Sequence, residues 1–325
     1  MSIHRVDVIK VNEIEKHPNA DALGIFRVGG FTVCLALADW TPRLPTLACY
    51  IQPDSVVDTT RPEFAWLDDG KGTGKARIKV KRLRGVCSQG LLIPAPEGFN
   101  EGDDAAEFLG VTHYEPPIET KSGDCAEAPA VYAPHYDVEN YNRFITQFIE
   151  GEEVVATEKI HGASSKICYT DGIFHVGSRT TWKKEDSNVL WWVGFKNHPE
   201  IGDFLKEHPE FVAYGEAYGR VQCLRYGADN SIKIVLFDLL RGNEWISWDE
   251  SQELTKQYRL PWVPLVYRGP FNEAKLRELS EGPSLIAGAK NIREGLVVKP
   301  VVERTDITLG RVQLKMISNE YLLKC

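Results

Sequence analysis

One lysine near the middle of the chain has neighbours that favour chemistry. Lys159 follows Glu158 and precedes His161 and Gly162, where the apolar, β-branched run 154–157 gives way to a turn. The run predicts a buried strand, and its end would fix the base of the lysine while the amine reaches into a cleft. Such an amine is a nucleophile once it has lost its proton. The alternative is an exposed lysine at a strand end, because a single short motif often matches by chance.

More charged and aromatic residues follow Lys159 in an order that weakens this alternative. In sequence they are Arg179, Glu216, Phe237, Glu294, Lys299 and Lys315. Glu216 ends an apolar run beside glycines, which suits contact with a ribose hydroxyl or a hydrated metal ion. The lysines can stabilise the negative charge of phosphates. Two of these residues also have a purely structural interpretation. Phe237 could be a core side chain in an apolar strand, and Glu294 could be a solvated acid in a turn.

This ordered set resembles the covalent nucleotidyltransferase superfamily of polynucleotide ligases and mRNA capping enzymes, over roughly residues 130–325. The Glu-Lys-Ile-His-Gly form of residues 158–162 is most similar to ATP-dependent RNA ligases of the second type, in which His often replaces the Asp of the DNA-ligase motif. The resemblance implies that Lys159 takes AMP from ATP as a phosphoramidate, which splits one difficult step into easier ones. The AMP then passes to a 5′-phosphate end, and the adenylylated end is joined to a 3′-OH end.

The resemblance also implies a task for each site residue. The catalytic set is Lys159, Arg179, Glu216, Glu294, Lys299 and Lys315. The nucleotide-binding set is Glu158, Lys159, Ile160, His161, Gly162, Arg179, Glu216, Phe237, Lys299 and Lys315. Phe237 would stack on the adenine, and Glu294 would help to hold Mg²⁺ or Mn²⁺. The ion and neighbouring lysines would lower the pKa of Lys159 from its free value of about 10.4.

Two positions depart from the resembled pattern. Many relatives carry two lysines near the C-terminus, spaced by one residue, whereas here Lys315 is accompanied by Gln313 or by Ile317, depending on the alignment. Ser164 stands where some relatives have Asn. Phosphate contacts at these places are therefore expected to be fewer or to come from elsewhere.

The front of the chain has a different pattern. Residues 1–112 alternate short apolar runs with turn residues, which predicts an OB-type β-barrel. The segments His-Pro-Asn-Ala-Asp-Ala-Leu at 17–23 and Ser-Gln-Gly-Leu-Leu at 88–92 resemble tRNA-binding OB-type barrels. The run 76–83 predicts one strand with its cations on one face, and we assign nucleic-acid contacts to Lys75, Arg77, Lys79 and Lys81. These cations could instead protect an edge strand.

The rest of the chain predicts a linker and a second domain. Residues 113–135 have linker composition, and residues 136–325 have an α+β pattern, expected to form a mixed nucleotidyltransferase domain with antiparallel sheets, similar to ATP-grasp-like ligases. Asp137 is expected to cap a short helix. Longer helices are expected near 187–206, 249–258 and 271–280. Trp182, Trp191 and Trp192 are expected to pack in the core rather than to stack on bases.

Composition limits the class of protein. The chain has 325 residues, a net charge of −8 and seven dispersed cysteines, which predicts one or two domains with reduced thiols in the cytoplasm. No apolar run approaches the roughly 20 residues that span a bilayer, and the N-terminus lacks a signal-peptide core. We therefore expect no membrane partner and a monomer. The negative net charge confines any nucleic-acid contact to local basic patches.

The combined interpretation is an ATP-dependent RNA ligase of the RNA ligase 5-type group, with its OB domain in front of the catalytic domain. DNA ligases and capping enzymes carry that domain behind the core, and only ten residues follow Lys315 here. The expected cofactors are ATP and Mg²⁺ or Mn²⁺, and the expected partner is a nicked duplex with RNA on the 3′-OH side, sealed in RNA repair. The alternatives are a capping-type guanylyltransferase, which would use GTP, and a non-catalytic RNA-binding adaptor.

Overall fold

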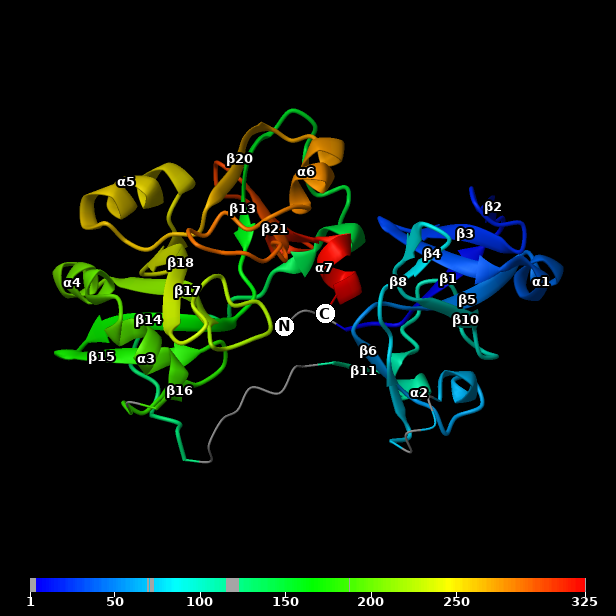
Figure 1. Ribbon diagram of the computed structural model, residues 1–325, viewed down its shortest axis with the longest axis horizontal. Coiled ribbons are helices and arrows are strands. Elements are labelled where there is room, and N and C mark those ends of the chain that lie inside the picture. The colour runs from blue at the N-terminus through cyan, green and yellow to red at the C-terminus, as the bar shows by residue number, and fades with distance from the viewer. Residues whose placement is uncertain (1–3, 69, 71–72, 115–122, 187, 325) are drawn as a thin grey trace. The chain divides into compact units, whose positions relative to one another are not determined.

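The computed structural model describes the chain except for residues 1–3, 69, 71–72, 115–122, 187 and 325, so the central part of the expected linker lies outside the described residues. It contains two compact units, one built mainly from residues 2–117 and the other from residues 118–321 (Figure 1). None of the helices that it describes is long and apolar enough to cross a membrane.

The first unit consists of short antiparallel strands. One sheet holds β1 (Asp7–Val11), β5 (Thr46–Ile51) and β10 (Leu91–Pro94), and another holds β2 (Glu15–Lys16), β3 (Leu23–Val28) and β4 (Phe31–Ala36). Further strands are β6 (Ser55–Asp58), β7 (Lys75–Arg77), β8 (Lys81–Leu83), β9 (Val86–Ser88) and β11 (Thr112–His113). The helical turns are α1 (Leu37–Trp40), η1 (Thr41–Arg43), η2 (Ala65–Leu67) and α2 (Ala106–Leu109). Inward side chains such as Val8, Ile51 and Phe64 form its core.

The expected single strand over 76–83 is wrong. The chain forms β7, which pairs with β6, and then β8, which pairs with β9 in a separate hairpin. Between them, the backbone of Ile78 bonds to the start of β6, donating to the Ser55 carbonyl and accepting from the N–H of Asp54, the residue before β6. Ile78 and Val80 are buried as the alternation predicted, but the cations do not share one strand face.

The second unit is built on two sheets. The six-stranded sheet has the order β16-β15-β14-β17-β18-β19, and the five-stranded sheet the order β12-β24-β21-β13-β20. The strands of the first are β14 (Ala163–Thr170), β15 (Ile173–Ser178), β16 (Trp182–Lys183), β17 (Phe211–Gly219), β18 (Ile232–Arg241) and β19 (Glu244–Trp245). Those of the second are β12 (Glu139–Asn140), β13 (Glu153–Lys159), β20 (Leu265–Pro270), β21 (Gly295–Pro300) and β24 (Leu314–Ile317). The ribbon β22 (Thr305–Asp306) and β23 (Gly310–Arg311) lies between β21 and β24 in sequence.

The helices of this unit partly match their sequence prediction. α5 (Trp248–Tyr258) and α6 (Glu273–Ser280) confirm two expected helices, and α7 (Asn319–Lys324) ends the chain. The expected helix over 187–206 is two helices, α3 (Leu190–Lys196) and α4 (Pro199–Glu207), because Pro199 favours a helix start and cannot donate the bond that a continuous helix requires. The expected Asp137 cap is wrong, since Asn140 caps the short turn η3 (Tyr141–Arg143).

The core of the second unit lies on the six-stranded sheet. α3 and α4 bury Trp191, Phe195 and Phe204 against Ile167 and Leu236 of β14 and β18. Trp182, Trp191 and Trp192 are each less than one-tenth exposed, which confirms that they pack in the core. The α+β class with antiparallel sheets is thereby confirmed for this unit, and the all-β class for the first.

Candidate active site

Sheet register brings the proposed nucleophile to a distant carboxylate. β13 and β21 run side by side (Figure 1). Lys159 is the last residue of β13 and pairs with Gly295, the first residue of β21, which directly follows Glu294. The two side chains form an ion pair, with Lys159 Nζ 2.7 Å from Glu294 Oε1 and exposed fractions of 26% and 10%. The structure therefore joins two predicted site residues that are 135 positions apart.

This ion pair fixes the charge of both partners. Burial by itself would lower the pKa of Lys159, but the carboxylates of Glu294 and Glu216 outweigh it and raise that pKa above its ordinary value. Burial would raise the pKa of Glu294, but the Lys159 charge and the His161 ring lower it to about 2. Lys159 is thus a protonated ammonium in this state, and its activation requires a change in its surroundings.

Glu216 completes the acidic side of the site. It lies on β17 opposite Ser164 of β14, and burial raises its pKa to about 8, with Glu294 adding repulsion and Lys159 opposing the shift. Gly162 lies against this strand so closely that a Cβ there would be 2.1 Å from the Ala217 carbonyl oxygen. The His-Gly turn after the lysine is therefore required by the approach of β17.

His161 is held by contacts that the sequence did not indicate. Its backbone N–H donates to the Tyr226 hydroxyl at 2.7 Å, and its Nδ1 lies 3.0 Å from the Tyr321 hydroxyl and 3.6 Å from Glu294 Oε2. Its Nε2 lies 3.4 Å from Cys223 Sγ. The ring is thus fixed beside the Lys159–Glu294 pair by residues with no recognisable spacing from it.

The residues that flank the lysine face apolar surroundings. Glu158 is 1% exposed, and burial raises its pKa. Its Oε2 accepts the Leu285 N–H at 2.6 Å, and its Oε1 has no hydrogen-bond partner among the described residues. Ile160 packs in an apolar cluster with Tyr218 and Val263, against which Phe237 also packs.

A bulge sets the position of Phe237. In the pairing of β17 with β18, Tyr214 opposes Asp238 and Gly215 opposes Leu236, so Phe237 is the extra residue. Its ring is partly buried, with its centre 4.7 Å from that of Tyr136. The half-exposed ring leaves both interpretations open, a core side chain and a surface that stacks on a base.

The other predicted cations of the site, Lys299, Lys315 and Arg179, have different surroundings. Lys299 is buried and lies 3.2 Å from both Asp238 Oδ1 and Glu303 Oε1. Lys315, on the strand beside β21, has its pKa lowered by burial and by the charge of Lys159, which places it in the field of the nucleophile. Arg179 lies 3.2 Å from Asp137, and its charge lowers the pKa of Glu216.

The two departures from the family pattern differ in their surroundings. The Ser164 carbonyl accepts the indole N–H of Trp191 at 2.9 Å, so its backbone supports the core. Gln313 is buried, with its Oε1 2.7 Å from the Tyr136 hydroxyl, which in turn lies 2.6 Å from Asp238 Oδ2. Gln313 therefore belongs to a polar cluster around Asp238.

Glu294 has the chemistry to help hold a divalent ion. Within the described part of the chain, no three His, Cys, Asp or Glu side chains converge on a ready-made metal site. Glu294 is ionised, and its buried Oε2 lacks a hydrogen-bond partner among the described residues. A hard carboxylate oxygen with a free lone pair fits Mg²⁺ or Mn²⁺.

The predicted nucleic-acid residues of the first unit fall into two groups. Arg77 bonds to Asp54 Oδ1 at 2.6 Å and lies 4.0 Å from the centre of the Tyr114 ring, so its charge is already partnered. Lys75, Lys79 and Lys81 are exposed.

The hairpin of β8 and β9, which begins at Lys81, carries two further cations. Arg82 and Arg84 are exposed on it. The His17 ring lies 3.1 Å from the Leu83 carbonyl and the Asn19 amide donates to the Arg84 carbonyl, so the His-Pro-Asn segment anchors this hairpin.

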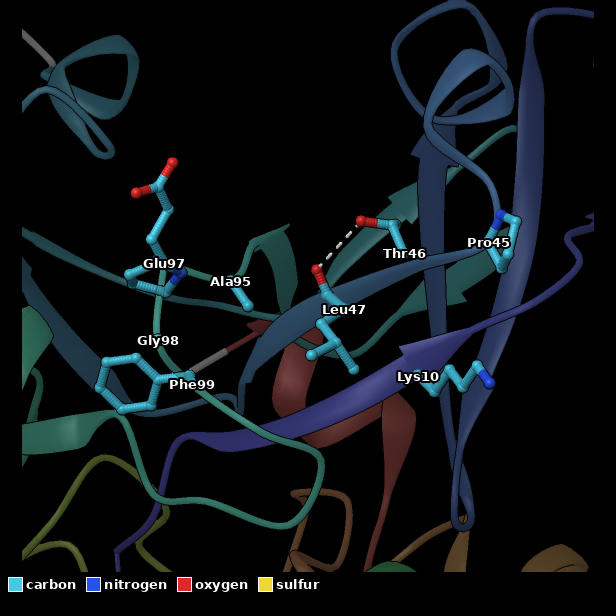
Figure 2. A pocket seen from close by; sticks show the side chains of 9 residues that line it. Lys10, Pro45, Thr46, Leu47, Ala95, Glu97, Gly98 and Phe99 are labelled. Atoms are coloured by element: carbon cyan, nitrogen blue, oxygen red, sulfur yellow. Dashed lines mark hydrogen bonds between the residues drawn. The ribbon is translucent and has the colours of Figure 1, made fainter.

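An open cavity also lies in the first unit. Lys10, Leu47 and Phe99 are among the residues that line it, as Figure 2 shows. It contains none of the predicted site residues. The predicted nucleotide-binding residues, from Glu158 to Lys315, all lie in the second unit.

Comparison with known proteins agrees with this fold. A family model for RNA ligase matches residues 152–317, and one for an OB-fold domain matches residues 5–95. The chain belongs to the RNA ligase family, and its first unit is an OB-fold domain. No curated protein matches.

Similar solved structures share the whole architecture. One is an apo RNA ligase of Naegleria gruberi, with a TM-score of 0.82, 25% identity and coverage of 98% of each chain. Another is a variant of that ligase with ATP and Mn, with a TM-score of 0.81, 25% identity and coverage of 98% of each chain. A third is a variant with AMP and Mn, with a TM-score of 0.82, 25% identity and the same coverage. The expected RNA ligase core with an OB domain in front is confirmed.

Proposed function

We propose that this chain is an ATP-dependent RNA ligase that forms a lysyl-AMP at Lys159 and joins 5′-phosphate to 3′-OH ends. The observation that carries the proposal is the ion pair of Lys159 with Glu294 at the β13–β21 junction, beside Glu216. The similar Naegleria ligases hold ATP or AMP together with Mn, which supports ATP and a divalent ion as the cofactors here.

The residues around Lys159 account for its activation. Mg²⁺ or Mn²⁺ held through Glu294 would supply positive charge to the α-phosphate. A Glu294 carboxylate that held such an ion would stabilise the proton on Lys159 less, so the pKa of the amine would be lower. Lys315 adds positive charge that favours the neutral amine and then faces the phosphate. The free amine can attack the α-phosphorus, and pyrophosphate leaves.

Other predicted residues fit contacts with the rest of the nucleotide. The apolar cluster of Ile160 and the half-exposed ring of Phe237 would receive the adenine. The Glu216 side chain, which lies beside Gly162 of the His-Gly turn, would accept a hydrogen bond from a ribose hydroxyl. Arg179 and Lys299 would contact phosphates of the nucleotide or of the RNA end.

The substrate would be a nicked nucleic acid with an RNA 3′-OH end. The chain would seal this nick during RNA repair and would act as a cytoplasmic monomer. The OB-fold domain supports a nucleic-acid partner, and its exposed cations Lys75, Lys79 and Lys81 offer phosphate contacts. Arg77 contributes less, because Asp54 already balances its charge.

Intact mass tests the proposed function. After incubation with ATP and Mn²⁺, the wild-type chain should gain one adenylate, and Lys159→Ala should gain none, because β13, whose residues are all described, carries no second lysine. Lys233→Ala, which removes an exposed lysine of β18, is the matched control and should gain the adenylate normally. Adenylate on the Lys159→Ala variant, or guanylate transfer from GTP in preference to ATP, would contradict the proposal.

A further inference from the structure

A second buried ion cluster lies beyond the nucleophile and includes a residue that no motif marks. Arg311 ends β23 and donates to Asp238 Oδ2 at 2.6 Å. The same guanidinium donates to Glu303 through Nε at 2.7 Å and through a terminal nitrogen at 2.5 Å. A fork-shaped guanidinium suits such a two-sided contact.

Lys299 shares these two carboxylates but is held less closely. Its Nζ lies 3.2 Å from Asp238 Oδ1 and 3.2 Å from Glu303 Oε1, longer than each of the Arg311 contacts. The exposed side-chain fractions are 1% for Asp238, 7% for Lys299, 11% for Arg311 and 19% for Glu303. The charges of two acids and two bases therefore balance in a cluster that is largely shielded from water.

Arg311 is needed for that balance. Gln313 and Tyr136, the polar neighbours of Asp238, carry no charge. Without Arg311, Lys299 alone would face the carboxylates of Asp238 and Glu303, and an uncompensated charge is strongly unfavourable in a buried cluster. Lys299 would then be bound more strongly by both acids.

Arg311 lies close in sequence to the place of the lysine pair in the family pattern. It precedes Gln313 by two positions, and the Gln313 N–H donates to the Arg311 carbonyl at 3.1 Å, in a tight turn between β23 and β24. Gln313 is neutral, and the second cation of this segment stands two positions earlier, at Arg311.

We propose that Arg311 is a positioning residue that satisfies Asp238 and Glu303 and so leaves Lys299 free to turn to a phosphate of the bound nucleotide. The inference rests on the proposed function, in which Lys299 contacts phosphate. The competing explanation is an ion cluster that only stabilises the fold.

A charge-balance rescue separates the two explanations. The variants are Arg311→Gln, Glu303→Gln and the double variant, and the readouts are single-turnover rates of adenylate attachment over a range of ATP concentrations, with thermal unfolding of each protein. Arg311→Gln should slow the step by about tenfold to a hundredfold, because a misplaced phosphate contact costs that much. The double variant removes one acid as well, so its rate should return to within a few-fold of wild type.

Several outcomes would overturn the inference. An unchanged rate in Arg311→Gln would do so, as would a double variant that unfolds like wild type yet remains as slow as Arg311→Gln. If Arg311→Gln fails to fold, Glu303→Gln decides alone: it removes a competitor for Lys299, so the step should be faster than in wild type, and a slower step contradicts the role. Failure of the wild-type chain itself to take adenylate would instead reject the proposed function.

Discussion

Lys159 and Lys299 lie on neighbouring paired strands, and both are held by carboxylates, yet their surroundings differ. Lys159 has Glu294 as its bonded partner and Glu216 close by. Among the described residues, the other base near the Glu294 carboxylate is His161, whose Nδ1 lies 3.6 Å from Glu294 Oε2. Lys299 shares its two acids with Arg311, which binds them more closely.

The difference separates two kinds of lysine chemistry. Around Lys159, the pKa values of the amine and of Glu216 are raised and that of Glu294 is lowered, so a change in the local charge can move a proton. Around Lys299, a permanently charged guanidinium shares both acids, which leaves the position of the lysine side chain as the property that can change. The first arrangement suits a nucleophile, and the second suits a phosphate contact.

The largest expected effect comes from removing the acid that holds the Lys159 proton. Glu294→Gln should slow adenylate attachment by about a hundredfold or more, since it removes a carboxylate from the proposed metal site. It should also lower the pKa of Lys159, because the anion that raises this pKa is gone. Peptide mass mapping can follow the modification of Lys159 by trinitrobenzenesulfonate at several pH values. In Glu294→Gln, the modification rate should rise at a lower pH than in wild type.

Glu253→Gln is the matched control for this measurement, because Glu253 is an exposed acid on α5 in the same unit. Its modification profile should match that of wild type. A Glu294→Gln profile that coincides with wild type, or moves to higher pH, would show that Glu294 does not hold the proton.

An intermediate effect is expected at Glu216, on stability rather than on rate. The pKa of Glu216 rises from 4.5 to about 8 in the folded chain. The unfolded chain therefore releases this proton at lower pH than the folded chain, so the free energy of unfolding should fall as the pH rises from 4.5 to 8 and level off above it. Glu216→Gln should lose this part of the pH dependence.

Urea unfolding of wild type and Glu216→Gln at pH 5, 6.5 and 8.5 would check the sign. The difference in stability between the two proteins should change in favour of the variant as the pH rises. An unchanged difference across this range would mean that Glu216 is ionised throughout, and the contrast between the two lysine clusters would be weaker.

The smallest effect on the catalytic unit is expected from cations that have no acid beside them. Lys81, Arg82 and Arg84 are exposed, and no ion pair joins them to another residue in the described ranges. The triple alanine variant should bind nicked RNA duplex more weakly and reduce the slope of log affinity against log salt by about 2 to 3, since each phosphate contact contributes about 0.9. Adenylate attachment should remain at the wild-type rate.

Arg77→Ala is the informative comparison for that variant. Arg77 is bound to Asp54 and stacked on Tyr114, so its loss should destabilise the first unit and leave the salt slope nearly unchanged. Equal salt slopes in wild type and the triple variant would place RNA binding elsewhere. Loss of adenylate attachment in the triple variant would mean that the two units do not act separately.

The sequence by itself predicted the candidate reactive positions. The order of Lys159, Glu216, Phe237, Glu294 and Lys299, each at an apolar run or a turn, placed them on the strands and turns of one domain, because burial periodicity and turn residues are local signals. The same signals predicted the helices at 249–258 and 271–280, the buried tryptophans and the separate all-β front part. They failed at Pro199 and at residues 78–80, where a short apolar pattern does not show where one element stops and the next begins.

Only the tertiary structure decided which charges meet. The partner of Lys159 follows from the register of β13 on β21, and the shared acids of Lys299 and Arg311 follow from the bulge at Phe237 and the ribbon before β24. His161 is fixed by Tyr226 and Tyr321 from distant segments. Strand register and bulges depend on long-range pairing, and a one-residue shift would exchange every facing side chain, so no local pattern could have named these partners.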